Sequence, residues 1–176
     1  MHLLRAAIVA GVLAGCGTVP YERRDVRHLL VGEWEVLPRG FYSENPDGSR
    51  FFPFGEDAVG RVILTASGYA ANQFQRKERS VCSTGTSPMN CTTDEAATAF
   101  KSAVAYQYRY TIEPEAENQL RGRIIWHVDF VMYPNWQDQI LPRQYEMSPD
   151  GNSWVFIAPL PLNPKQAVKV HLQRIA

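Results

Sequence analysis

From residue 30 onward, the chain is a succession of short runs in which apolar and polar side chains alternate. In the first run, Trp34 and Val36 fall on one face of an extended chain, while Glu33 and Glu35 fall on the other. A repeat of two residues is the pattern of a β-strand that buries one face. The sequence therefore predicts a domain built mainly from strands.

About eight such runs follow one another, and most are joined by short segments that favour turns, such as Pro149-Asp150-Gly151-Asn152. The expected strands lie at 30–36, 59–65, 69–75, 106–112, 120–132, 140–147, 154–158 and 167–175. An antiparallel meander of this size avoids exposed edges by closing into an up-and-down barrel. Such a barrel has room for one small ligand. The predicted fold class is all-β, an antiparallel barrel of about eight strands.

One α-helix is expected within this order of strands. Thr92 followed three residues later by Glu95 is the signature of a capping box. Ala96, Phe100 and Val104 then follow at helical spacing. The sequence predicts a helix from about residue 92 to 104, inserted between two strands.

The two ends of the chain favour closure of the barrel. Val170, Leu172 and Arg174 share one face of the last expected strand. An arginine that ends an apolar face needs a partner, and Trp34 on the first strand offers its ring, a contact worth roughly 0.5–2 kcal/mol. The alternative is that Arg174 is a solvated terminal residue.

The first 15 residues have the plan of a secretory signal peptide. Arg5 precedes a short apolar run, and small residues then lead to Cys16. Leu13-Ala14-Gly15-Cys16 resembles the lipobox of bacterial lipoproteins, in which the cysteine receives lipid and becomes the first residue of the mature protein. The alternative is an ordinary secreted protein cut near Ala14, with Cys16 a bystander.

This resemblance implies three segments: a signal peptide at 1–15, a lipidated tether at 16–28 and a barrel domain at 29–176. The membrane would be a partner through the N-terminal lipid, because several acyl chains anchor durably. The expected location is the cell envelope. Gly17 after the cysteine favours the periplasmic face of the outer membrane in a Gram-negative cell.

Charge and motifs exclude several functional classes. The chain has 18 basic and 18 acidic residues, without the basic patch that binding of nucleic acid requires. Neither a phosphate-binding loop nor a dinucleotide fingerprint is present, so no cofactor is expected. No Gly-x-Ser-x-Gly elbow supports serine hydrolase chemistry.

The remaining cysteines, Cys82 and Cys91, flank a loop of small polar residues. Export to an oxidising compartment favours a disulfide between them. Free thiols or two metal ligands are the alternatives, but metal sites usually have a closer cysteine pair and nearby histidines. A disulfide and no metal site are expected.

Several segments together are similar to the bacterial and fungal lipocalin-like domain. Gly32-Glu33-Trp34 with the closing Arg174 is similar to the general lipocalin pattern. Pro53-Phe54-Gly55-Glu56-Asp57 and Pro134-Asn135-Trp136, in that order, are more specific. The resemblance runs from about residue 29 to 174 and implies a lipocalin-type barrel, but little chemistry. The cysteine-bearing loop departs from the usual pattern, which puts a lid-like role for that loop in doubt.

Candidate ligand-binding residues are polar or aromatic side chains on the expected strands: His127, Asp129, Tyr108, Tyr110, Arg143 and Tyr145. His127 and Asp129 lie on the strand face opposite Trp126, Val128 and Phe130. If that face points inward, they form a polar pair suited to proton transfer; if it points outward, they are solvated. Tyr106, Tyr108 and Tyr110 form a stripe on one face of an expected strand, a pattern that more often packs a barrel wall than forms a ligand cage.

Three functions follow as hypotheses. The first is a lipid-anchored envelope protein whose barrel binds a small hydrophobic molecule in a mainly apolar cavity. The second is an interaction module for another envelope protein, which predicts a large exposed apolar patch. The third is an enzyme of the isomerase or cyclase type that uses His127 and Asp129, so enzymatic activity stays open.

Overall fold

The computed structural model describes residues 25–83, 87–160 and 163–175. Residues 1–24 lie outside this range, with the expected signal peptide, Cys16 and most of the expected tether. The described elements, in chain order, are α1 (Val26–Leu30), β1 (Gly32–Glu44), β2 (Arg50–Phe51), β3 (Val59–Leu64), β4 (Tyr69–Gln75), the 3-10 helix η1 (Pro88–Asn90), α2 (Thr93–Lys101), β5 (Ala103–Pro114), β6 (Arg121–Val131), the 3-10 helix η2 (Pro134–Trp136), β7 (Ile140–Met147), β8 (Ser153–Leu160) and β9 (Asn163–Arg174).

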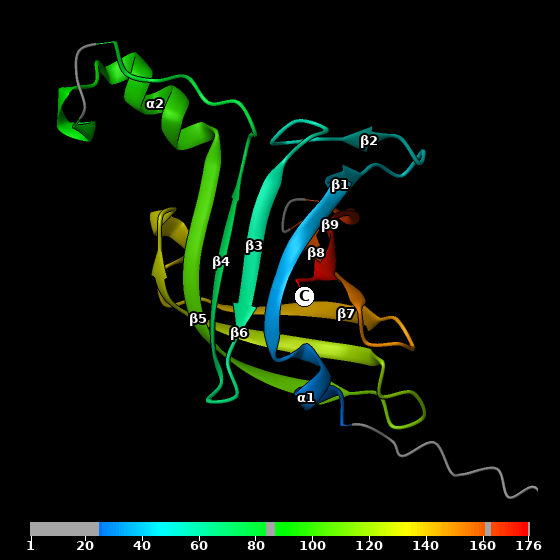
Figure 1. The fold of residues 1–176 in the computed structure, drawn as a ribbon. Helices are drawn as coiled ribbons and strands as arrows, with labels where there is room; N and C mark the ends of the chain where they lie inside the picture. Colours follow the sequence, from blue (N-terminus) through cyan, green and yellow to red (C-terminus); the bar gives the residue numbers. More distant parts are fainter. Residues whose placement is uncertain (1–24, 84–86, 161–162, 176) are drawn as a thin grey trace, which may run out of the picture.

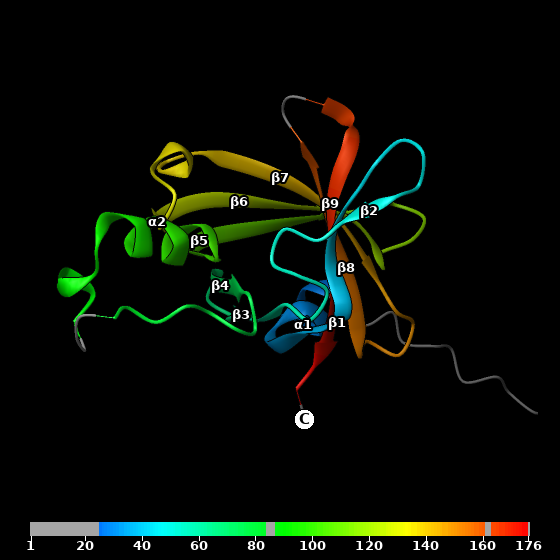
Figure 2. The same cartoon turned by 90° about the horizontal axis from the view of Figure 1, so that it is seen from above.

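Eight of the strands form a closed antiparallel barrel, which confirms the predicted fold class. The order is β1-β3-β4-β5-β6-β7-β8-β9, and β9 pairs with β1 to close the ring. The two-residue strand β2 adds to β1 outside this ring. Figure 1 shows the strands wrapped around a common interior, and Figure 2 shows the same arrangement from above.

Alternating side chains supply the core, as the two-residue repeat predicts. In β3, Val62 and Leu64 are buried while their neighbours Arg61 and Ile63 are exposed. Large aromatic residues fill the interior alongside aliphatic ones, and the fully buried side chains include Trp34, Trp126, Tyr108, Tyr145, Phe74, Ile124 and Leu172. The interior is thus partly filled by its own aromatic rings.

Helix α1 closes one end of the barrel. Its residues Val26 and Leu30 are fully buried, and the side chain of Asp25 caps it by accepting a hydrogen bond from the amide of Arg27. The indole Nε1 of Trp34 donates to the carbonyl of Leu30 at 2.9 Å. The folded part therefore includes residues 26–28, which the sequence had assigned to the tether.

Arg174 joins the first and last strands beside α1. Its guanidinium lies 4.2 Å from the centre of the Trp34 ring, and the two residues are register partners across the β1–β9 seam. It also donates to the carbonyls of Leu29, Val31 and Gly151. The contact expected between the two ends of the chain is therefore present, and backbone acceptors reinforce it.

The inserted helix α2 lies at the other end of the barrel, next to the start of β5 (Figure 1). Thr92 and Glu95 form the predicted capping box, and Cys82 and Cys91 form the predicted disulfide just before it. The expected apolar face of the helix does not enter the core: no residue of α2 is buried, and Phe100 is 43% exposed. No helix in the described ranges is long and apolar enough to span a bilayer.

Candidate functional site

A pocket opens into the barrel at the end where α2 lies, opposite α1. Its volume is about 260 Å³. Most of its lining is apolar and comes from most of the barrel strands, the segment after β2 and η2: Phe41, Pro53, Phe54, Phe74, Val104, Tyr106, Trp126, Trp136, Leu141, Arg143, Phe156, Ala158, Pro159 and Val168. We call it the mouth pocket.

Contacts between aromatic rings hold the wall of the mouth pocket in place. Phe41 packs against Phe54 and Phe74 with ring centres 5.0 and 5.1 Å apart. Trp126 packs edge-on against Phe156 at 5.1 Å. Rings packed at these distances in tilted or edge-on geometry stabilise one another beyond simple burial. The pocket is therefore a formed part of the barrel.

Three buried polar side chains form a directed chain of hydrogen bonds behind one wall. The hydroxyl of Tyr108 donates to Oδ1 of Asn72 at 2.9 Å, and Nδ2 of Asn72 donates to the hydroxyl of Tyr106 at 3.0 Å. Burial raises the pKa of Tyr106 to about 12, so this phenol stays protonated at neutral pH. The chain ends at Tyr106, which lines the pocket.

Arg143 is the one charged residue in the lining of the mouth pocket. Its guanidinium lies 5.1 Å from the centre of the Trp126 ring, and Nη1 donates to the carbonyl of Pro142 at 3.0 Å. Its Nε is buried without a hydrogen-bond partner, as is Nε1 of Trp126. Burial lowers the pKa of the Arg143 guanidinium from its usual value. An apolar pocket with a few convergent polar groups is the usual form of a small-molecule site.

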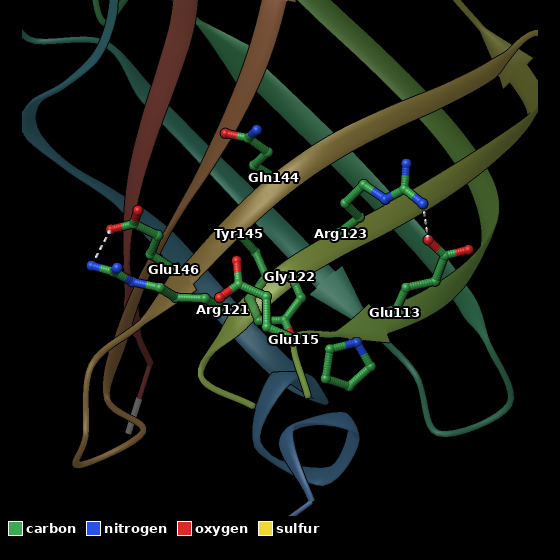
Figure 3. A pocket seen from close by; sticks show the side chains of 9 residues that line it. Glu113, Glu115, Arg121, Gly122, Arg123, Gln144, Tyr145 and Glu146 are labelled. Carbon is green, nitrogen blue, oxygen red and sulfur yellow. Dashed lines mark hydrogen bonds and ion pairs between the residues drawn. The ribbon is translucent and has the colours of Figure 1, made fainter. Parts of the chain in front are cut away.

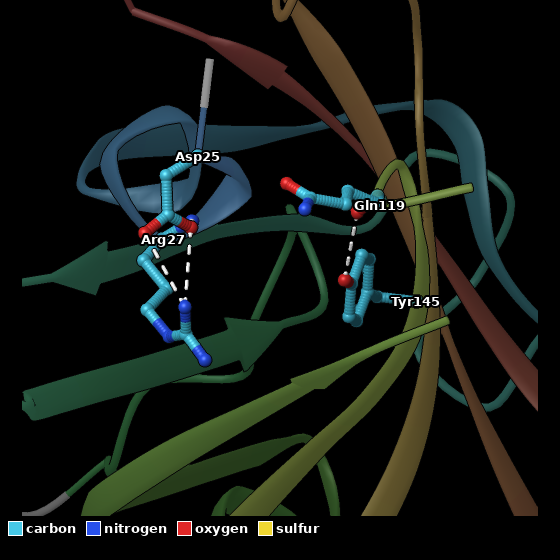
Figure 4. Close-up of polar contacts among 4 residues, drawn as sticks. All are labelled: Asp25, Arg27, Gln119 and Tyr145. Carbon is cyan, nitrogen blue, oxygen red and sulfur yellow. Dashed lines mark hydrogen bonds and ion pairs between the residues drawn. The ribbon is translucent and has the colours of Figure 1, made fainter. Parts of the chain in front are cut away.

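Tyr145 shares the inward face of β7 with Arg143 but lies near α1. Its hydroxyl donates to the carbonyl of Gln119 at 2.9 Å, beside the Asp25–Arg27 ion pair (Figure 4). Its ring packs over Gly122, where a Cβ would come within 3.0 Å of it. Tyr145 therefore belongs to the closed end and not to the mouth pocket.

A second hollow, of about 580 Å³, lies among charged side chains of β5, β6 and β7 (Figure 3). Four of its charged side chains are paired: Arg123 with Glu113 at 2.6 Å, and Arg121 with Glu146 at 3.7 Å. These side chains are about half exposed, so water screens them. The hollow also contains Glu115, and it lacks the apolar lining of the mouth pocket.

The remaining predicted tyrosines do not line the mouth pocket. Tyr108 is fully buried, and its hydroxyl is linked to the pocket residue Tyr106 through Asn72. Tyr110 is half-buried, and its hydroxyl donates to the carbonyl of Thr65 at 2.7 Å. The tyrosine stripe on β5 therefore divides into one pocket residue, Tyr106, and two residues of the wall.

His127 and Asp129 lie on the outward face of β6. Val128 between them and Trp126 just before them are buried in the interior. Asp129 faces Nε of Arg109 at 3.5 Å, and the described structure gives no hydrogen bond between His127 and Asp129. Neither residue lines the mouth pocket. The hypothesis of an acid–base pair inside the barrel is therefore wrong, because both side chains face outward.

A β-bulge corrects another expectation on the same strand. Phe130 was expected to share the inward face of Trp126 and Val128, but it is 69% exposed. The register between β5 and β6 shifts after Gln107, where Phe130 pairs with Gln107 and Val128 with Tyr108. Asp129 is the extra residue, and it reverses the inward and outward directions of the side chains that follow it, so Phe130 points outward.

Sequence reasoning missed several residues of the pocket. Phe41 lies in the second half of β1, beyond the expected end of that strand, and Trp136 lies in η2. Asn72, which links the two tyrosines, gave no signal beyond its place in an expected strand. The Pro134-Asn135-Trp136 segment was noted only as part of a family pattern. Among the described residues, no group of three or more His, Cys, Asp or Glu side chains could hold a metal ion.

Comparison with known proteins gives one finding. A family model described as a lipocalin-like domain matches residues 31–170, which is most of the chain and nearly all of the barrel. No curated protein and no solved structure matches the chain significantly.

Proposed function

Because the chain belongs to the lipocalin-like domain family, we propose that it binds a small hydrophobic ligand in the mouth pocket of its barrel. The observation that carries this proposal is the pocket's lining. Aromatic rings such as Phe41, Phe54 and Phe156 face a space of about 260 Å³ that opens at one end of the barrel. This volume lies just below the range of about 300–1,000 Å³ that is usual for ligand pockets, so the ligand should be small.

The proposal is tested by filling the pocket. Calorimetric titration of the purified barrel with decanol, a neutral amphiphile, is expected to show saturable binding. Ala158 lines the pocket, so Ala158→Phe should remove much of its volume and abolish binding. Val155 alternates with the buried Trp154 and Phe156 and faces outward, so Val155→Phe is the matched control. Binding that survives in Ala158→Phe would contradict the proposal.

We also propose that the barrel is anchored in the cell envelope by lipid on Cys16. The support is the sequence Leu13-Ala14-Gly15-Cys16, with an apolar run and a positive charge before it. Asp25, the first described residue, caps α1 at the closed end of the barrel. A tether attached there leaves the mouth pocket at the opposite end, away from the anchor.

Metabolic labelling with a radioactive fatty acid tests the anchor. The full chain should carry the label and sediment with membranes, and Cys16→Ser should do neither. The double substitution Cys82→Ser with Cys91→Ser is the matched control. It removes the disulfide and should leave labelling at Cys16 unchanged. Label that persists in Cys16→Ser would refute attachment at this residue.

A further inference from the structure

Two buried N–H donors at the wall of the mouth pocket lack acceptors. They are Nε of Arg143 and Nε1 of Trp126, and the guanidinium of the first lies over the ring of the second. Buried donors in folded proteins are almost always hydrogen-bonded, because an unmade bond costs the full desolvation of the group. Both residues line the mouth pocket, whereas the third such donor among the described residues, Nε1 of Trp154, does not, so the wall of this pocket holds two donors without an acceptor.

A third donor lies at the same wall. Tyr106 accepts from Asn72, and Asn72 accepts from Tyr108, so all protons in this chain point the same way. A phenol that accepts one hydrogen bond keeps its own proton to donate. Tyr106 also lines the mouth pocket, and its ring centre lies 5.5 Å from that of Trp126, so its hydroxyl belongs to the same wall as the other two donors.

The charge of Arg143 has no counter-ion among the described residues. The ion pairs found there involve other residues, and no side chain that lines the mouth pocket is acidic. Tyr106 and Tyr108 lie close enough to affect its pKa, but burial raises the pKa of both phenols, so they carry no charge at neutral pH. A largely buried charge is costly unless it is paired. The missing partner is therefore an acceptor that carries negative charge.

We propose that the ligand of the mouth pocket is an amphipathic monoanion, a small carboxylic acid with an apolar body. Its carboxylate accepts from Arg143, Trp126 and Tyr106, and its apolar body lies against Phe41 and Phe54 toward the opening. A single guanidinium matches the single charge of a carboxylate; a phosphate monoester would bring a second charge without a partner. This inference rests on the proposed function, since it names the class of ligand that the pocket takes.

Comparison of decanoate with decanol tests the inference, because the two share their chain and differ in charge. Calorimetric titration of the barrel at neutral pH should give about 10- to 100-fold tighter binding of decanoate, the effect of one charge-assisted interaction. Arg143→Met keeps the apolar stem and should erase this preference. Tyr106→Phe should weaken decanoate several-fold and leave decanol unchanged. Arg109→Met, on the outward face of β5, is the matched control.

The outcomes separate this inference from the proposed function. Equal affinity of the unaltered protein for decanoate and decanol overturns the anionic ligand while the apolar pocket stands. A preference for decanoate that persists in Arg143→Met also overturns it. Failure of the unaltered protein to bind either compound overturns the proposed function and this inference together. If Arg143→Met does not fold, the comparison in the unaltered protein and in Tyr106→Phe still decides.

Discussion

Two inward-facing arginines of the barrel have opposite surroundings. Arg174 stacks on Trp34 and donates to three backbone carbonyls at the closed end. Arg143 stacks on Trp126 but leaves a buried Nε unpaired in the mouth pocket. The same residue type is therefore part of the architecture at one end and available to a ligand at the other.

The first prediction at this scale concerns Arg174. Arg174→Met should destabilise the barrel by about 2–3 kcal/mol, because it leaves buried carbonyls unpaired and removes the cation–π contact. Arg174→Lys should recover only part of this loss, since one ammonium group cannot reproduce the planar fork. Urea unfolding followed by tryptophan fluorescence measures both. A loss under about 0.5 kcal/mol, typical of a surface substitution, would show that the seam does not need this residue.

For Arg143 we expect a change in the free energy of unfolding of the opposite sign. Without ligand, Arg143→Met should stabilise the barrel by about 1 kcal/mol, because it replaces an unpaired, largely buried charge with an apolar side chain. The expected rise in Tm is about 2–4 °C, measured by calorimetry in ligand-free buffer. Arg109→Met, which removes only an exposed ion pair with Asp129, should leave Tm nearly unchanged. A fall in Tm for Arg143→Met would mean that the guanidinium is structurally satisfied.

At the scale of elements, α2 is the part of the fold least tied to the core. None of its residues is buried, and the start of the helix is held by the capping box, the Cys82–Cys91 disulfide and the bonds of Glu95 to Ser83. Arg79 donates to the carbonyl of Ala99 near the other end of the helix. The hydrogen bonds to Glu95, first those from Ser83 and then those from Thr92, lower its pKa to about 2 from 4.5. The carboxylate form therefore holds this segment in place.

The third prediction follows from that lowered pKa. A depressed folded-state pKa gives a stabilising effect that is present above the ordinary value and is lost as pH falls through the folded one. Order at the start of α2 should therefore be retained at pH 5 and lost between about pH 4.5 and 2. Hydrogen exchange of the Ser83 and Thr92 amides measures it. Glu95→Gln should remove this pH dependence. Titration of Glu95 should leave hydrogen exchange in the barrel strands unchanged.

Individual elements show what the sequence could predict. The strands Tyr69–Gln75 and Ile140–Met147 have the expected bounds, because turn-forming segments next to them, such as Ala66-Ser67-Gly68 and Pro149-Asp150-Gly151, mark where they begin or end. The first strand continues past Val36 to Glu44 through an irregularity that alternation could not predict. Phe130 is exposed because of a bulge at its neighbour, a feature of pairing between strands that one strand's pattern does not contain.

The candidate site was predictable only in part, for the same reason. Arg143 was a candidate from its strand position, and it does line the pocket. His127 and Asp129 were candidates on a face whose direction depends on register, and they point outward. Trp136 and Phe41 reach the pocket from a 3-10 helix and from beyond a bulge. Their role follows from the closed barrel and not from local pattern.

At the scale of the whole molecule, the two ends of the barrel differ in kind. Trp34 and Trp154 pack together near α1, with ring centres 5.9 Å apart. Trp126 and Trp136 line the mouth pocket at the other end. The eight expected strands predicted a barrel with room for one ligand, the resemblance implied a lipocalin-type barrel, and the family match confirms the domain. One pair of tryptophans therefore packs together at the end near α1, while the other pair lines the mouth pocket.

The last prediction uses this division of the tryptophans. Decanoate at about 100 times its Kd should add about 2.7 kcal/mol of stability by mass action. That corresponds to a rise in Tm of roughly 5–10 °C for a domain of this size. Tryptophan emission should change on binding, because Trp126 and Trp136 both line the mouth pocket. Trp126→Phe combined with Trp136→Phe should remove most of that change, whereas Trp154→Phe, at the closed end, should keep it. A ligand response that depends on Trp154 instead would place binding in the α1 half of the barrel, away from Arg143.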